Sequence, residues 1–255
     1  RISGRWKDKI VGVYPGDAKE AQRHHIKGRE ETIVIPNGVD LQLLDRHRLS
    51  REEARAELSL PRDGYIFGTI GNFYPAKDLP RYLEACAMVR KTCPNVHFAL
   101  IGDGPERTLI EDARKHHHLE DVVHLLGARE AASRYLLAFD SFVFPSSKEG
   151  MAFALLEAMT AGLPCIVTDV GANRWMLEDA RWIVPAKDPV RLAEAMQNAY
   201  HDRRRATEQG VRSRKLVETR FPVTQTYASH ENLLIQFSSS KEMRTGEGSE
   251  TARMR

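Results

Sequence analysis

The chain has 255 residues, enough for one large domain or two small ones with a substantial buried core. Its composition, 42% hydrophobic and 29% charged, excludes disorder throughout, and no apolar run reaches the roughly 20 residues of a membrane span. The three cysteines (Cys86, Cys93 and Cys165) have no metal-ligand spacing, which argues against a disulfide scaffold and a metal centre.

The net charge of +3 is concentrated in one stretch. Residues 201–220 hold seven Lys or Arg against three Asp or Glu. Such a stretch is typical of a solvated helix face, and the alternative is contact with an anionic membrane surface. We expect no nucleic-acid partner, because no aromatic residues that could stack on bases are interleaved with these charges.

Short apolar, β-branched runs alternate along the chain with longer amphipathic stretches. The runs that predict strands are 32–36, 65–71, 96–102, 122–127, 141–145, 164–168 and 181–185. The stretch over 78–92 has Leu79, Leu83 and Cys86 at helical spacing, and Pro94 ends it. This alternation predicts an α/β protein with a Rossmann-like parallel sheet and helices on both faces.

The last part of the chain changes in character. Residues 222–237 predict a final helix, whereas residues 238–255 have almost no apolar side chains and no period. Because such a segment buries too little apolar surface to order itself, we predict a disordered tail there.

Ligands of doubly wound sheets bind at the carboxyl ends of the strands, where loops lead into helix N-termini. The loops after Gly71, Ile101 and Pro145 are rich in Gly, Pro and polar residues. We therefore expect these three loops to form one rim around a ligand.

Two of these loops carry candidate phosphate contacts. Lys77 stands immediately before the helix predicted over 78–92, where its ammonium and the free backbone N–H groups would meet a phosphate. The alternative is an ordinary surface lysine. In the next loop, Gly102 and Gly104 either allow close approach of the backbone to a ligand or form a tight turn.

The third loop begins the segment 145–164, which predicts a strand end, a turn and a helix ended by Gly162 and Pro164. Glu149 precedes this helix, and Glu157 lies about two turns into it. Because most of the helix is apolar, Glu157 needs a partner, which the hydroxyl groups of a ligand would supply. The alternative is a partly exposed glutamate on an amphipathic helix.

Together these motifs resemble a known family. The segment VIPNGVD at 34–40, Lys77 before a helix, LIGDGPER at 100–107 and EGMAFALLEAMTAGLPCIVTDVGAN at 149–173 resemble the donor-binding half of family 4 retaining glycosyltransferases. The family has the GT-B fold, so the sheet is expected to be one half of a two-domain protein. The resemblance implies a remnant of the N-terminal acceptor domain and linker at 1–36, a donor-binding domain at 37–237 and the tail at 238–255.

The resemblance also implies roles for individual residues. In the family, Glu149 corresponds to the glutamate against the transferred sugar, Glu157 to the one that binds the ribose hydroxyls, and Lys77 to the lysine that holds the donor diphosphate. Glu149 and Lys77 are therefore the predicted catalytic residues. The predicted donor-binding residues are Gly71, Asn72, Lys77, Gly102, Gly104, Leu125, Gly150, Met151, Ala152, Phe153 and Glu157.

Three positions depart from the family pattern. Asn72 stands where an arginine commonly shares the diphosphate, and Asp78 stands where glycine usually follows the lysine. Trp175 occupies a position where the family often has glutamate. These departures predict weaker contacts to the diphosphate and altered contacts around Gly171 and Asn173.

The function that the resemblance implies is transfer of a hexosyl group, with retained anomeric configuration, from a UDP- or GDP-linked sugar to an acceptor hydroxyl. The acceptor is expected to be a glycan or a lipid-linked sugar of cell-envelope polysaccharide synthesis, bound mainly by the N-terminal domain. No cofactor or metal is expected, and the location is the cytoplasm or the inner membrane face. With most of the acceptor domain absent, the chain should bind the donor without transferring sugar.

Two alternatives remain open. One is an epimerase or glycogen-synthase-like enzyme on a similar fold. The other is a scaffolding module that retains the fold without turnover.

Overall fold

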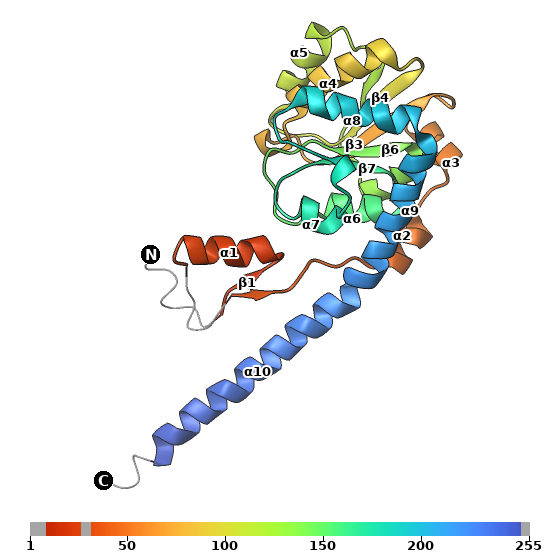
Figure 1. Cartoon of the computed structure of the whole chain (residues 1–255). Coiled ribbons are helices and arrows are strands. Elements are labelled where there is room, and N and C mark those ends of the chain that lie inside the picture. Colours follow the sequence, from red (N-terminus) through yellow and green to blue (C-terminus); the bar gives the residue numbers. More distant parts are fainter. Residues whose placement is uncertain (1–8, 27–31, 251–255) are drawn as a thin grey trace.

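The computed structural model describes residues 9–26 and 32–250 and shows two unequal parts joined by a linker (Figure 1). The smaller part is a two-stranded parallel sheet of β1 (Val11–Gly12) and β2 (Ile33–Val34), with α1 (Pro15–Arg23) between the strands in sequence. This sheet is separate from the main one. It contains the first predicted strand and lies within the segment assigned to the acceptor domain and linker.

The main sheet has six strands, and all of its pairings are parallel. In spatial order they are β5 (Val123–Leu125), β4 (Val96–Ile101), β3 (Tyr65–Ile70), β6 (Ser141–Phe144), β7 (Cys165–Thr168) and β8 (Ile183–Val184). Together with β2, these strands confirm all seven predicted runs. Parallel strands covered on both faces are mostly apolar, as the fully buried strand β3 illustrates.

Helices cover both faces of this sheet, as predicted. Figure 1 shows α4 (Leu79–Thr92), α5 (Arg107–His116) and α8 (Pro189–His201) above the sheet, and α6 (Phe153–Thr160), α7 (Asn173–Leu177) and α9 (Arg203–Arg220) below it. The short helices α2 (Leu41–His47), α3 (Arg51–Glu57) and η3 (Ala132–Ala138) complete the second face. The core between the layers includes Phe67 stacked on Phe98, with Tyr82 of α4 against Phe98.

The order of the strands creates a switch point between β3 and β6. From β3 the chain continues to β4 and β5 on one side, and from β6 it continues to β7 and β8 on the other. The crevice at the carboxyl ends of two such strands is where open α/β sheets bind their ligands. The loops after β3 and β6, which the sequence predicted to share a rim, therefore meet there.

The last helix, α10 (Val223–Glu250), extends away from the main domain (Figure 1). It starts beside the linker, where Thr226 Oγ1 donates a 2.9 Å hydrogen bond to the carbonyl of Pro36. The sequence predicted disorder from residue 238, whereas the helix continues to Glu250 and residues 251–255 lie outside the described range. The prediction considered only the burial of apolar surface, whereas a helix pairs its backbone N–H and C=O groups within itself and does not need tertiary burial for that.

Candidate functional site

The two predicted catalytic residues are in direct contact at the switch point. Lys77 Nζ lies 2.6 Å from Glu149 Oε1, and the two side chains are only 21% and 13% exposed. The ammonium also lies 4.7 Å from the ring centre of Phe144, the last residue of β6. The sequence assigned both residues to one ligand but did not predict that they pair with each other.

The loop after β3 holds Lys77 in the short helix η2 (Pro75–Lys77). The backbone N–H of Ser147, in the loop after β6, donates a 2.7 Å hydrogen bond to the carbonyl of Ala76. Phe73 is buried beneath the loop and bonds through its backbone to Asp103 and Glu106 in the loop after β4. Backbone contacts thus join all three predicted loops into one rim.

Gly102 and Gly104 have positive φ angles of +151° and +157°. A Cβ atom on Gly102 would lie 1.9 Å from the carbonyl oxygen of Gly71, and one on Gly104 would lie 2.8 Å from the backbone nitrogen of Phe73. The close approach that the sequence assigned to a ligand is therefore made by the neighbouring loop, and the alternative of a tight turn describes these glycines better. Contact of either glycine with a donor stays a prediction.

Two residues that the predicted site did not include support the loop that carries Glu149. Gly171 has φ +53° and packs so closely that a Cβ atom would lie 2.4 Å from the Glu149 carbonyl oxygen. On the linker, Asn37 Nδ2 donates a 2.9 Å hydrogen bond to the carbonyl of Met151. Both contacts are made to backbone atoms of the supported loop, which residue spacing does not reveal. The sequence signal for Asn37 and Gly171 was their place in the family-like motifs at 34–40 and 149–173.

The rest of that loop leads into α6. The backbone N–H of Ala172 donates to the carbonyl of Gly150, Met151 is buried, and Ala152 is the N-cap residue of α6. Phe153 is the first residue of the helix and is 54% exposed. The buried Met151 anchors the loop, and the exposed Phe153 ring is an apolar surface at its end.

Glu157 lies one turn into α6 and is half-buried, and this partial burial raises the pKa of its carboxyl group. Within residues 9–26 and 32–250, no hydrogen bond or ion pair engages its carboxylate. A partly buried carboxylate without a protein partner carries a cost, and a ligand with hydroxyl groups would offset it. The partial exposure of Glu157 also fits the alternative of a glutamate on an amphipathic helix, so its contact with a ligand stays a prediction.

The predicted rim residues Asn72 and Leu125 frame the site. Asn72 is exposed and follows β3, while Leu125 is half-buried at the end of β5. Asp78 adopts a left-handed conformation (φ +50°), which explains why glycine suits this position. The Asp78 carboxylate makes no capping hydrogen bond to α4 and pairs with Arg81 at 2.8 Å.

Trp175 of α7 lies against residues at the end of α9. Its ring lies 5.3 Å from that of Phe221, and the Arg220 guanidinium lies 4.9 Å from its centre. The side chain therefore packs against the end of α9 rather than replacing a glutamate in the site.

In the part of the chain that the structure describes, no three His, Cys, Asp or Glu side chains come close enough together to hold a metal ion. The same residues include no helix with the length and apolar character of a membrane span.

Comparison with known proteins shows the family of the chain. Residues 50–216 match the family described as glycosyl transferases group 1, and the chain belongs to that family. Over 152 residues it is 33% identical to UDP-Gal:alpha-D-GlcNAc-diphosphoundecaprenol alpha-1,3-galactosyltransferase of Escherichia coli, covering 57% of this chain and 38% of that protein. Over 231 residues it is 26% identical to N-acetyl-alpha-D-glucosaminyl L-malate synthase of Bacillus anthracis, covering 87% of this chain and 60% of that protein.

Among solved structures, the Anabaena protein HepE in complex with UDP has a TM-score of 0.82 and 19% identity, covering 92% of this chain and 65% of HepE. This likeness shows the fold, and it confirms the predicted α/β architecture with a Rossmann-like parallel sheet. The chain thus spans about two fifths to three fifths of the length of the two curated relatives named above.

Proposed function

We propose that this chain is the donor-binding half of a family 4 retaining glycosyltransferase and binds a nucleoside diphosphate sugar at the Lys77–Glu149 pair. The observation that carries the proposal is this pair itself: a cation and a carboxylate in contact at the switch point, each with a single ionic partner among the described residues and partial access to solvent. A diphosphate is the natural competitor for the ammonium, and sugar hydroxyls are the natural donors to the carboxylate.

In the proposed reaction, the bond between the anomeric carbon and the diphosphate oxygen breaks, and the acceptor hydroxyl oxygen forms a bond to that carbon on the same face. The acceptor proton passes to the departing diphosphate. Lys77 and the backbone N–H groups of the rim stabilise the negative charge that develops there. Glu149 orients the sugar, and Glu157 accepts hydrogen bonds from the ribose hydroxyls.

The names of the relatives support the choice of donor and acceptor. The Escherichia coli relative is named for a UDP-linked donor and an undecaprenol-linked acceptor, and HepE was solved with UDP. We propose a UDP-linked donor, with a GDP-linked one as the alternative, and a lipid-linked sugar of envelope polysaccharide as the acceptor. The reaction would take place in the cytoplasm or at the inner membrane face.

Calorimetric titration of the chain with UDP, GDP and their sugar conjugates tests the proposal. Lys77→Ala should weaken diphosphate binding by about 1.5–3 kcal/mol, the scale of a lost hydrogen bond to a charged group. Lys91→Ala, at the far end of α4, is the matched control and should leave affinity unchanged. If neither nucleotide binds, or if both variants behave alike, the donor site is elsewhere.

Glu149→Gln separates the sugar from the diphosphate. Because Glu149 holds the ammonium in the free protein, its neutralisation should preserve or strengthen UDP binding while removing the extra affinity of the UDP-sugar. An equal loss for both ligands would mean that the loop has collapsed.

One observation favours a second candidate, a binding module without turnover. Asn72 supplies no charge where the family commonly has an arginine, so the leaving group has one cation fewer. Product analysis of the whole protein with a labelled UDP-sugar distinguishes the two: glycosylated product supports the transferase, and donor binding without any transfer or hydrolysis supports the module.

A further inference from the structure

A second polar cavity lies at the opposite edge of the sheet from Lys77. It has a volume of about 500 Å³ and is formed where β3 and β4 begin, with five charged residues in its wall: Arg51, Glu52, Arg62, Asp63 and Arg203. We call it the amino-edge cavity. Because β3 has six residues that each rise about 3.3 Å, roughly 20 Å separate this cavity from the Lys77–Glu149 pair.

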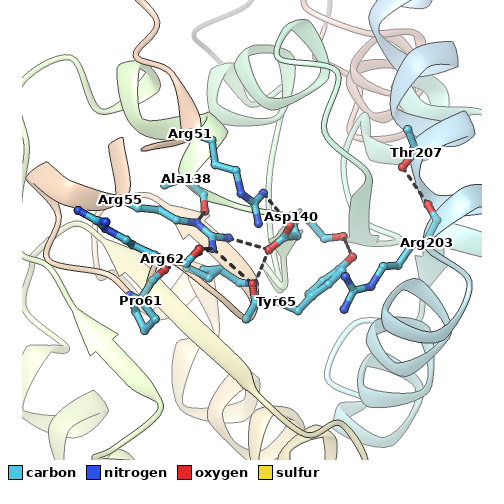
Figure 2. A network of polar contacts seen from close by, with 12 residues as sticks. Arg51, Arg55, Pro61, Arg62, Tyr65, Ala138, Asp140, Arg203 and Thr207 are labelled. Atoms are coloured by element: carbon cyan, nitrogen blue, oxygen red, sulfur yellow. Dashed lines mark hydrogen bonds and ion pairs between the residues drawn. The ribbon is translucent and has the colours of Figure 1, made fainter. Parts of the chain in front are cut away.

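Two arginines of the amino-edge cavity are held in place (Figure 2). Arg51 Nη1 lies 2.7 Å from Asp140 Oδ1, and the Arg203 guanidinium lies 5.1 Å and 5.4 Å from the ring centres of Tyr65 and Tyr200. A guanidinium that is already oriented loses less conformational entropy when it binds an oxyanion. These side chains are therefore better suited to a ligand than free surface arginines.

The amino-edge cavity contains arginines that are not engaged by the protein's own carboxylates. Among the described residues, neither Arg62 nor Arg203 forms an ion pair with a carboxylate, whereas Arg204, the next residue on α9, pairs with Glu208 at 3.1 Å. Most of the basic stretch is paired within the chain, as Arg205 with Asp202 and Arg214 with Asp45 show. Arg62 and Arg203 can therefore bind an anion without breaking an ion pair.

Glu52 and Asp63 determine what kind of anion the cavity suits. Both line it, and neither forms an ion pair among the described residues. They would repel a bare phosphate, but a carboxylate is a strong acceptor for sugar hydroxyl groups. We infer that the amino-edge cavity is a second ligand site, which binds a phosphorylated sugar with its phosphate on Arg62 and Arg203 and its hydroxyls on Glu52 and Asp63.

The test uses glucose 6-phosphate as the probe, titrated into the 255-residue protein by calorimetry, with inorganic phosphate and glucose in parallel. Glucose 6-phosphate should bind more tightly than either component. Arg62→Ala and Arg203→Ala together should weaken it about tenfold or more, as expected for lost charge-assisted hydrogen bonds, while Arg204→Ala should not change it. Arg62→Ala alone keeps the Arg203 ring contacts intact and should still weaken binding.

Neutralising the Glu52 and Asp63 carboxylates should change the affinities for the two anions in opposite directions. Glu52→Gln with Asp63→Asn should weaken glucose 6-phosphate and strengthen inorganic phosphate, a crossover that a general loss of structure would not produce. If both anions strengthen together, the sugar part of the inference is overturned.

Lys77→Ala separates this site from the proposed donor site. Glucose 6-phosphate should bind this variant as tightly as the parent chain, whether or not UDP binds the parent. If binding is lost with Lys77→Ala and retained in the Arg62 and Arg203 double variant, the ligand occupies the carboxyl edge and the inference is wrong.

Discussion

Two ion pairs at opposite edges of the same sheet have similar lengths and different surroundings. At the carboxyl edge, Lys77 and Glu149 are 2.6 Å apart, and each side chain is partly exposed. At the amino edge, Arg55 and Asp140 are 2.8 Å apart, and the Arg55 side chain is only 2% exposed. The contact distance alone does not distinguish a pair that a ligand can open from one that supports the fold.

The difference lies in how completely each pair is satisfied. Arg55 also donates to the carbonyls of Ala138 and Arg62 at 2.9 Å and 2.7 Å, and Asp140 accepts from the backbone of Ile66 and from Arg51 (Figure 2). By contrast, the one hydrogen bond recorded for Glu149 in the described residues is that from Lys77. A ligand can replace that single partner, whereas no ligand could replace the network around Arg55 without unfolding its surroundings.

The largest expected effect follows from removing the buried pair. Arg55→Ala removes one donor to Asp140 and leaves several buried carbonyls without theirs, so the free energy of unfolding should fall by about 3–5 kcal/mol. Arg51→Ala removes the more exposed partner of the same carboxylate and should cost about 1 kcal/mol or less. Urea denaturation measures both losses. Equal losses would contradict the claim that the buried Arg55 stabilises the fold more than the exposed Arg51 does.

Glu157→Gln tests the carboxyl-edge site, because nucleotide affinity and the stability of the fold should change in opposite directions. Nucleotide affinity should fall by about 1–3 kcal/mol if the carboxylate accepts from ribose hydroxyls. Stability at neutral pH should instead rise, since the variant no longer buries a charged group without a partner. A variant that loses stability and keeps its UDP affinity would show that Glu157 has a purely structural role.

The pH dependence of that gain has a definite sign. Burial raises the pKa of Glu157, so the folded protein binds its proton more readily than the unfolded chain, in which the pKa is about 4.3. The cost of burying the carboxylate is fully present above the folded pKa and disappears as the pH falls through it. The stability difference between Glu157→Gln and the parent chain should therefore shrink between pH 7 and pH 4.

A smaller effect is expected at the linker. Asn37→Ala removes the hydrogen bond to the Met151 carbonyl, worth about 1 kcal/mol, and should lower UDP-sugar affinity by up to about fivefold as the Glu149 loop loosens. Thr226→Val is the matched control, because it removes the neighbouring linker bond to Pro36 without touching that loop. Affinity that responds equally to both variants would point to a general effect on the linker.

The sequence predicted the sheet well because its buried strands are continuous apolar runs, such as residues 65–70 and 96–101. It also located the rim, since parallel strands bring their carboxyl ends to one edge. The Lys77–Glu149 contact joins residues 72 positions apart and depends on side-chain conformations that no spacing encodes. Likewise, the roles of Gly102 and Gly171 depend on backbone atoms of other loops, which only the folded structure brings near.

The smallest expected effect concerns the exposed rim of the carboxyl-edge site. Asn72→Arg would add a guanidinium beside the diphosphate, and UDP binding at low ionic strength should tighten by about 0.5–1 kcal/mol, because exposed charges contribute little and salt screens them. Tyr74→Arg places the same charge on the exposed Tyr74 position of the same loop. If the two arginines strengthen binding equally, the gain is long-range attraction. A gain confined to Asn72→Arg, falling as salt is added, indicates direct contact with the diphosphate at the site that Lys77 and Glu149 define.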